Sequence, residues 1–404
     1  MSTGMAAPTG PARQLEGDCW PTARQRLLLR AALLDGPASL EAWQAWRAAR
    51  PAHLDPGSQR LLPVLYRNLR RQGLASAELA GYQRAYRQSW YQNQVRLGEL
   101  AAVLPAFQAA GMEIVVLKGP ALVIQHYRDI GLRPIGDLDL LVRAQQAAQA
   151  LEIVAGLGWT QAEVPNPAVV VSILQGVGFS APGRPGLDLH WHVLWEACHP
   201  TIDEAFWSAA VPLAINGQPT LALCPTDQLL HVCVHGARWS PIPPLRWAAD
   251  AIHILGAAAI DWDRLLALAA RFRLGLPLRD ALGYLARELE AEIPRSILTS
   301  LAGLPVSRLD RGFYARKTRR RGLLGDLPLK YQHYRLHREM LGAAGAPASF
   351  GRYLHALWGQ PPLWRLPGLA LRKARERLRS FPRRAPGASA PPSGQDSQEP
   401  FRRW

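Results

Sequence analysis

Residues 113–143, EIVVLKGPALVIQHYRDIGLRPIGDLDLLVR, contain two short apolar runs separated by a glycine turn and a basic loop. The runs are residues 114–117 and 138–142, and apolar runs of this length between turn signals predict buried strands. Successive side chains of a strand point to opposite faces, so Asp137 and Asp139 project to the same side while the leucine between them points into the core. The two carboxylates therefore converge, and bound cations are the expected means of neutralising them beside an apolar sheet.

The same acidic pair occurs a second time, as Asp261-Trp262-Asp263. That copy directly precedes an apolar pattern with helical spacing, where an aspartate accepts free backbone N–H groups and suits the helix dipole. A motif this short also arises by chance, so the pattern alone assigns no function. Its surroundings favour the first copy, which lies in a strand, follows a strand and a glycine turn, and has Asp188 downstream as a third carboxylate.

Asp188 belongs to a stretch with clean alternation, residues 187–193, LDLHWHV. In a strand, Asp188, His190 and His192 share one face, and the apolar residues share the other. Two imidazoles and a carboxylate form a known zinc ligand set, so zinc is one interpretation. The interpretation that we favour is that one histidine orients Asp188 while the other is solvated or lies in the core.

Periodicity and composition divide the chain into five parts, and the predicted fold class is α+β. We expect a flexible lead at 1–20, an N-terminal helical region at 21–110, a mixed α/β unit at 111–224, a helical domain at 225–345, and a basic, largely disordered tail at 346–404. Within these parts the patterns predict helices over 26–34, 40–49, 60–71 and 121–127, a long helix over 77–110 with a break or kink at Pro105, strands over 159–164, 177–181 and 187–194, a hairpin of 212–215 with 218–223, and a helix capped by Thr226.

Composition excludes several classes of protein. The 404 residues suffice for two or three domains, and the hydrophobic fraction of 48% is ordinary for a folded protein. No run of apolar residues is long enough for a membrane span, and the N-terminus has no apolar core of the signal-peptide type. The four cysteines are scattered without C-x-x-C spacing, so we expect a reduced, cytoplasmic chain without a transmembrane segment.

The formal net charge of +16 is concentrated near the C-terminus. Residues 301–404 contain 21 Lys and Arg against 6 Asp and Glu, so the remainder of the chain is nearly neutral. We therefore expect an anionic partner, a nucleic acid or a membrane surface, to contact the basic tail. Arginine outnumbers lysine 43 to 4, which indicates a base-composition bias and makes Lys118, the only lysine before residue 317, unusual.

The order of strand, glycine turn, helix, Asp-x-Asp strand and later acidic strand resembles the nucleotidyltransferase superfamily of the DNA polymerase beta type. The chain is most similar to an uncharacterised bacterial family of nucleotidyltransferases. Three blocks carry the resemblance: Leu117-Lys118-Gly119, RPIGDLDLLV at 133–142, and Asp188-Leu189-His190-Trp191. The resemblance covers roughly residues 85–345 and implies a nucleotidyltransferase palm, a mixed sheet with helices, between an N-terminal helical layer and a C-terminal helical domain.

The resemblance also implies a reaction, the transfer of a nucleoside monophosphate from an NTP to an acceptor hydroxyl. It implies that Asp137, Asp139 and Asp188 hold two Mg²⁺ (or Mn²⁺) ions, with Asp188 also acting as a base. The residues that would bind the nucleotide are Lys118, Gly119, Arg133 and Gly136. His190 and His235 would contact the substrate or support the metal ligands. The acceptor could be a sugar, a small natural product, a protein side chain or an RNA 3′ end.

One position departs from the superfamily pattern. The glycine turn usually continues with Gly or Ser, whose N–H contacts phosphate, whereas Pro120 has no N–H to donate, although proline suits the first turn of a helix. Two alternatives therefore stay open. One is a catalytically degenerate nucleotide-binding or scaffold protein. The other is a metal-dependent glycosyltransferase, which also uses Asp-x-Asp but requires a larger α/β sheet before the motif.

Overall fold

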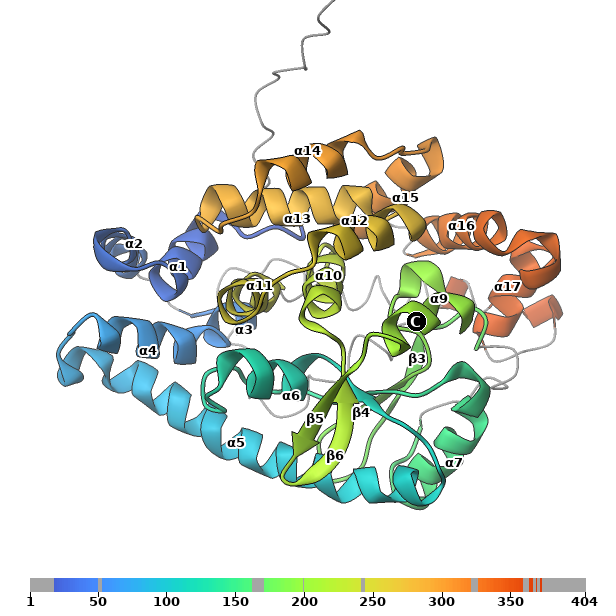
Figure 1. The fold of residues 1–404 in the computed structure, drawn as a ribbon, viewed down its shortest axis with the longest axis horizontal. Coiled ribbons are helices and arrows are strands. Elements are labelled where there is room, and N and C mark those ends of the chain that lie inside the picture. The colour runs from blue at the N-terminus through green and yellow to red at the C-terminus, as the bar shows by residue number, and fades with distance from the viewer. Residues whose placement is uncertain are drawn as a thin grey trace, which may run out of the picture.

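Six strands form one mixed sheet in the order β3-β4-β2-β1-β6-β5 (Figure 1). They are β1 (Val115–Val116), β2 (Leu138–Leu141), β3 (Gly176–Phe179), β4 (Leu187–His190), β5 (Val211–Ile215) and β6 (Gln218–Ala222). β2 runs parallel to β4 and β1 parallel to β6, whereas the other neighbours are antiparallel. The computed structural model describes residues 18–49, 53–161, 171–198, 200–240, 244–320, 326–358, 363–365, 368 and 371–372.

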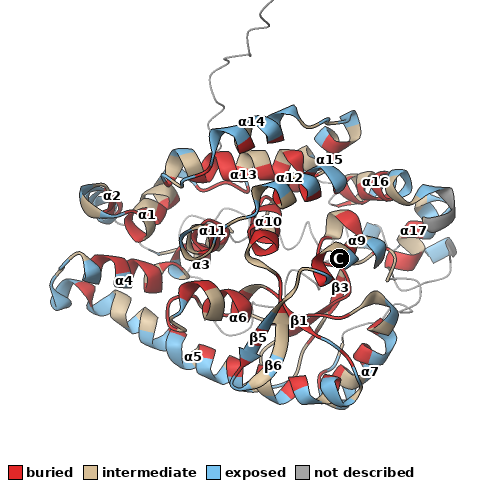
Figure 2. Cartoon of the chain, viewed as in Figure 1, coloured by how far each residue is buried: buried red, intermediate tan, exposed pale blue. Residues whose placement is uncertain are grey.

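The central strands are buried on both faces, as Figure 2 shows. Alternate residues therefore enter two different hydrophobic cores. One face contributes Val115, Leu117 and Leu141 to the core shared with α10 (Pro225–Gly236), and the other contributes Val116, Leu138 and Leu140 to the core shared with α5 (Ser76–Ala109) and α7 (Ala147–Gly156). This double burial explains why these strands read as continuous apolar runs in the sequence.

The chain enters the sheet through helices. These are α1 (Ala23–Leu33), α2 (Gly36–Ala48), α3 (Pro56–Gln59), α4 (Leu62–Arg71) and the long α5. The predicted break or kink at Pro105 is not a break, because α5 continues through this residue to Ala109. A proline inside a helix costs about 3 kcal/mol, but the fully buried Leu104 and Phe107 on either side anchor α5 in the core and offset that cost.

After β1 the chain forms α6 (Lys118–Leu122) and a π-helical turn (Val123–Tyr127), which together match the helix predicted over 121–127. The remaining helices are α9 (Pro200–Trp207), α11 (Arg246–Ala257), α12 (Trp262–Arg271), α13 (Gly275–Glu288), α14 (Arg295–Gly303), α15 (Arg308–Thr318), α16 (Leu327–Gly345) and α17 (Phe350–Leu357). None of the helices in the described ranges has both the length and the apolar character needed to cross a membrane.

Two helix starts test the capping predictions. Asp261 caps α12, because its carboxylate accepts the backbone N–H of Arg264 at 2.9 Å, so the second Asp-x-Asp has the structural role expected for it. The prediction that Thr226 caps α10 is wrong. Cys224 occupies the capping position, and the Thr226 hydroxyl instead accepts the backbone N–H of Asp261 at 2.9 Å.

The helical regions at the two ends of the chain share one core, although the sequence analysis places them in separate domains. Trp20 packs against Trp247 of α11 and Tyr284 of α13, with ring centroids 5.9 and 5.7 Å apart. Residues 18–20 therefore do not belong to a flexible lead, since Cys19 and Trp20 are buried. The helices before and after the sheet enclose it together rather than as independent units.

Three smaller differences concern element boundaries. The strand predicted over 159–164 is reduced to one bridge between Thr160 and Ser180, and residues 162–164 lie outside the described residues. The hairpin of β5 and β6 turns at Asn216-Gly217 as predicted, with both residues at positive φ. The tail predicted from residue 346 begins with α17, whose Tyr353 is fully buried against α16, while residues 373–404 lie outside the described part of the chain.

Candidate functional site

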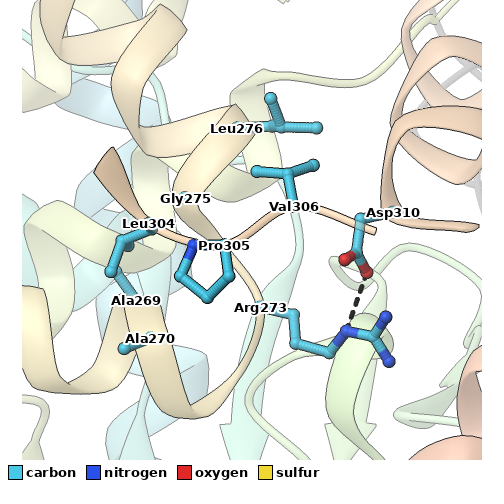
Figure 3. A pocket seen from close by; sticks show the side chains of 9 residues that line it. All are labelled: Ala269, Ala270, Arg273, Gly275, Leu276, Leu304, Pro305, Val306 and Asp310. Atoms are coloured by element: carbon cyan, nitrogen blue, oxygen red, sulfur yellow. Dashed lines mark ion pairs between the residues drawn. The ribbon is translucent and has the colours of Figure 1, made fainter. Parts of the chain in front are cut away.

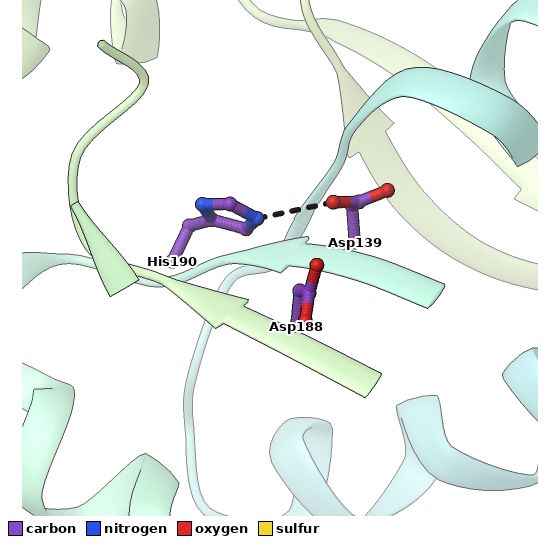
Figure 4. A group of neighbouring side chains, drawn as sticks. All are labelled: Asp139, Asp188 and His190. Carbon is purple, nitrogen blue, oxygen red and sulfur yellow. Dashed lines mark hydrogen bonds and ion pairs between the residues drawn. The ribbon is translucent and has the colours of Figure 1, made fainter. Parts of the chain in front are cut away.

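Asp139 and Asp188 face each other on neighbouring strands of the sheet. β2 and β4 are parallel, and their register places Asp139 directly opposite Asp188. The carboxylate oxygens of these residues and a ring nitrogen of His190 all lie within 4.8 Å of one another (Figure 4). His190 Nε2 lies 3.1 Å from Asp139 Oδ1. The structure therefore brings together Asp139, Asp188 and His190, and we call these three residues the acidic cluster.

Asp137 lies beside the acidic cluster rather than in it. β2 begins at Leu138, so Asp137 belongs to the segment that leads into the strand. Its Oδ1 is buried without a hydrogen-bond partner and lies against the backbone of Gly186, where a Cβ would come within 2.6 Å of it. Burial, together with the charge of Asp139, raises the pKa of Asp137 to about 6. The expected meeting of three carboxylates thus holds for two of them in this structure.

The cation beside these carboxylates is Lys118, which follows β1 and begins α6. Its Nζ lies 2.5 Å from Asp139 Oδ1. The backbone of Lys118 adopts φ +49°, a left-handed conformation that is uncommon for a residue with a side chain. Strained residues of this kind are held in place by their surroundings and cluster at functional sites. The ammonium group is therefore fixed at the carboxylate that the sequence analysis assigns to metal binding.

The surroundings of Asp139 and Asp188 shift the pKa values of their carboxyl groups in opposite directions. Burial raises the pKa of Asp188 well above its usual value, and the negative charge of Asp139 adds to this effect. Burial acts on Asp139 in the same sense, but the charge of Lys118 and the hydrogen bond from His190 outweigh it, so the pKa of Asp139 falls below its usual value. Two carboxyls this close share one negative charge until a further cation is present.

His190 is neutral at this position. Burial lowers its pKa, and a neutral imidazole that faces a carboxylate must carry its proton on the facing nitrogen. His190 Nε2–H therefore donates to Asp139, not to Asp188 as the sequence analysis expected of one histidine. The zinc set that includes His192 is not formed, since His192 Nδ1 lies 2.5 Å from Asp203 Oδ2 and Nε2 lies 2.6 Å from the carbonyl of Val171.

Two further histidines reach the cluster from α10. The charges of Lys118, His190 and Asp139 act on His231, and burial lowers the pKa of His231 to about 3. Burial also lowers the pKa of His235, whose ring lies 5.8 Å from that of His231. His231 is buried and His235 is partly accessible, so His235 is the one available to contact a substrate. Sequence reasoning named His235 for this role but not the packing role of His231.

Arg133 and Gly119 meet over the glycine turn. Arg133 Nη1 lies 3.0 Å from the point where a Cβ would stand on Gly119, so any other residue at this position would crowd the guanidinium. The other guanidinium nitrogens bind Asp250 of α11, with Nε 2.7 Å from Oδ1 and Nη2 2.9 Å from Oδ2. Tyr127 also donates its hydroxyl to Asp250 at 2.7 Å. Arg133 is therefore held in the protein by Asp250, and its Nη1 faces the turn where nucleotide phosphates were expected.

The segment that contains Gly136 is fixed by α5. Asn93 accepts the backbone N–H of Ile135 at 2.8 Å and donates to the carbonyl of Arg133 at 2.8 Å. Arg96 Nε donates to the carbonyl of Gly136 at 3.1 Å. The roles of Asn93 and Arg96 could not be predicted from the sequence, because an asparagine and an arginine on a long helix carry no recognisable signal of their partners. Gly136 contributes to this network through its carbonyl, and its Cα faces open space.

Two cavities lie elsewhere in the helical region. The first is lined mainly by apolar side chains of α12 to α15, and its charged groups, Arg273 and Asp310, pair with each other at 2.8 Å (Figure 3). The second adjoins it and contains the ion pair of Lys317 and Glu196. In both cavities the charged side chains satisfy one another, so the acidic cluster is the stronger candidate for chemistry.

Similarity to known proteins is found among solved structures and in one sequence family. No curated protein matches the chain. Among solved structures, the antibiotic-resistance factor ANT(2'')-Ia is 16% identical with a TM-score of 0.33, and the match covers 48% of this chain and 98% of that one. A nucleotidyltransferase-like protein from Paracoccidioides brasiliensis is 13% identical with a TM-score of 0.33, covering 52% and 93%. A family model described as uncharacterised nucleotidyltransferase matches residues 57–289, more than half of the chain. The chain therefore belongs to this family of uncharacterised nucleotidyltransferases.

Proposed function

We propose that the protein transfers a nucleoside monophosphate from an NTP to an acceptor hydroxyl at the acidic cluster. The observation that carries this proposal is the register of β2 and β4, which brings Asp139 and Asp188 together in a chain of this family. Buried carboxylates this close are costly unless a cation balances them. A bound metal ion would offset the electrostatic cost of placing these two carboxylates side by side.

The donor set fits a divalent cation. Asp139 and Asp188 offer carboxylate oxygens, which Mg²⁺ and Mn²⁺ prefer, and Asp137 has an unbonded buried Oδ1 close by that could serve as a further oxygen ligand. His190 holds Asp139 by its Nε2–H and so orients the carboxylate. A bound cation would neutralise the triphosphate and stabilise the charge that develops on it during transfer.

The side chains of the chain take distinct roles in the reaction. The acceptor oxygen attacks the α-phosphorus, its proton passes to the carboxylate of Asp188, and the bond from the α-phosphorus to the oxygen that bridges to the β-phosphate breaks to release pyrophosphate. Lys118 pairs with Asp139 in the free protein and would move its charge to the leaving pyrophosphate. Gly119 lets Arg133 Nη1 approach the phosphates at the start of α6.

The test uses α-labelled NTPs with Mg²⁺ or Mn²⁺ and a screen of acceptors, sugars, small natural products, peptides and RNA, with products identified by mass spectrometry. We expect label transfer by the native protein and a loss of at least a thousandfold in Asp139→Asn and Asp188→Asn, since metal ligands and bases contribute that much together. Asp263→Asn, in the second Asp-x-Asp, is the matched control and should keep full activity. Transfer that survives in Asp139→Asn would refute the proposal.

A second candidate is a nucleotide-binding protein without transfer activity. Pro120 lies at the first turn of α6, where it offers no N–H to a phosphate, and the ammonium of Lys118 already neutralises Asp139. This candidate predicts NTP binding with no labelled product for any acceptor. The glycosyltransferase alternative receives no support, because the described residues before β1 form helices α1 to α5 rather than the larger sheet that it requires.

A further inference from the structure

Arginines from three separate helical elements gather around residues 133–137, the segment that leads into β2. We call Arg60, Arg96, Arg133 and Arg246 the arginine cluster. Arg60 follows α3, Arg96 lies on α5, and Arg246 is the first residue of α11. They are far apart in the sequence, and the fold brings their charges together.

Two members of the arginine cluster donate hydrogen bonds to the backbone of residues 133–137. Arg246 Nη1 donates to the carbonyl of Pro134 at 2.8 Å, and Arg96 Nε donates to the carbonyl of Gly136 at 3.1 Å. Each of these arginines uses one nitrogen to hold the backbone, and the charges of both act on Asp137. The guanidinium groups are therefore positioned by the segment but are not neutralised by it, because a carbonyl carries no net charge.

Arg60 is the least satisfied member of the arginine cluster. Its charge interacts with those of Asp137 and Arg133, yet its guanidinium makes no hydrogen bond or ion pair with the described residues. It is partly buried. No group in the described part of the chain accepts a hydrogen bond from this guanidinium, although a partly buried guanidinium normally binds a carboxylate or a phosphate.

The charges around the segment do not balance. Asp250 pairs with Arg133 and its charge also acts on Arg246, while the charge of Asp137 interacts with those of Arg60, Arg96 and Arg246. The four guanidinium groups of the arginine cluster thus have two carboxylates beside them, which leaves an excess of positive charge at a partly buried position. Such an excess is costly without a further anion.

We infer that the arginine cluster binds the triphosphate of the NTP. The inference rests on the proposed function and adds to it the residues that recognise the donor substrate. The arginine cluster adjoins the acidic cluster, because Arg96 and Arg246 hold the segment that leads directly into Asp139 of β2, and Arg133 Nη1 lies at Gly119, next to Lys118. Since Pro120 removes a backbone donor from the glycine turn, the arginine side chains would supply the contacts that this turn supplies in related enzymes.

The test measures binding of inorganic tripolyphosphate to the full chain by calorimetry, with a chelator present and at physiological salt. We expect Arg60→Met to weaken binding about tenfold, since a charge-assisted contact contributes about this much. Arg60→Lys should retain part of the binding, since an ammonium keeps the charge but cannot bind phosphate oxygens through two parallel N–H groups as a guanidinium does. Arg60 is the primary site for substitution because its guanidinium makes no hydrogen bond or ion pair with the described residues. Arg246→Met should weaken binding at least as strongly.

Matched controls separate this site from other basic surfaces. Arg271→Met removes an exposed arginine of α12, and Arg383→Gln with Arg384→Gln removes two charges from the basic tail. Both should bind tripolyphosphate as the native chain does. Binding that survives Arg60→Met and Arg246→Met but is lost in the tail variant would overturn the inference.

Steady-state kinetics distinguish an NTP from an anionic acceptor as the ligand of the arginine cluster. They also separate a failure of this inference from a failure of the proposed function. Arg60→Met should raise KM for the NTP about tenfold and leave KM for the acceptor unchanged; the reverse result would assign the arginine cluster to an anionic acceptor and refute the inference. Tripolyphosphate binding that depends on Arg60, in a chain without transfer activity, would refute the proposed function alone. Transfer activity with unchanged NTP affinity in both arginine variants would refute the arginine cluster alone.

Discussion

Removing the charge of Asp250 should destabilise the whole fold. This carboxylate is 3% exposed and accepts hydrogen bonds from the Tyr127 hydroxyl, from Arg133 Nε and from Arg133 Nη2 at 2.7, 2.7 and 2.9 Å. Asp250→Asn preserves the shape of the side chain but leaves the buried guanidinium of Arg133 without its counter-ion. Breaking a buried ion pair by removing one partner costs about 3–5 kcal/mol, and we expect a loss near 3 kcal/mol because the amide oxygen still accepts one hydrogen bond.

The assay is urea unfolding followed by tryptophan fluorescence, which reports on the core because Trp20 and Trp247 are both buried there. Asp263→Asn, at an exposed position of α12, is the control and should change the free energy of unfolding by less than about 0.5 kcal/mol. The double variant Arg133→Met with Asp250→Leu should recover most of the loss, since it removes both charges together. A change below about 1 kcal/mol in Asp250→Asn would refute the importance assigned to this ion pair.

Two further perturbations test other parts of the structure. Lys118→Met should tighten Mn²⁺ binding by on the order of tenfold, because the ion no longer displaces an ammonium from Asp139, and should slow transfer; calorimetry that finds weaker Mn²⁺ binding would contradict the placement of Lys118. Burial lowers the pKa of His333 from 6.5 to about 4, so this residue stabilises the fold fully above pH 6.5 and loses that contribution as the pH falls toward 4. Between pH 7 and pH 5 the native chain should lose about 2 kcal/mol more than His333→Gln in urea unfolding, and equal losses would contradict this assignment.

Local patterns in the sequence predict the strands around the acidic cluster well. The alternation in residues 187–193 and the acidic pair in residues 137–139 are periodic signals that survive folding because both strands are buried, and β2 and β4 lie where these signals place them. The Asn216-Gly217 turn is equally local, since only residues tolerant of positive φ fit it. In each case the conformational preferences of a few adjacent residues determine the local structure.

Long-range contacts are what the sequence does not reveal. Asp137 is separated from the acidic cluster because it precedes β2, and its carboxylate packs against the backbone of Gly186, a contact that no local pattern reveals. The helix through Pro105 survives because of burial at Leu104 and Phe107, which depends on the rest of the fold. Arg60 and Arg246 reach the same segment from positions 186 residues apart in the sequence. In a chain with 43 arginines, no local feature distinguishes these two from the others.

The central claim is that Asp139 and Asp188 together bind a divalent cation at the place where an NTP reacts. Anomalous diffraction at the manganese edge, from crystals grown with Mn²⁺ and a non-hydrolysable NTP, tests this claim most directly. We predict a manganese peak at a coordination distance of about 2.1 Å from a carboxylate oxygen of each aspartate, with the Lys118 ammonium displaced from Asp139. A bound nucleotide whose manganese lies away from both carboxylates, or a peak that persists unchanged in Asp139→Asn, would contradict the claim.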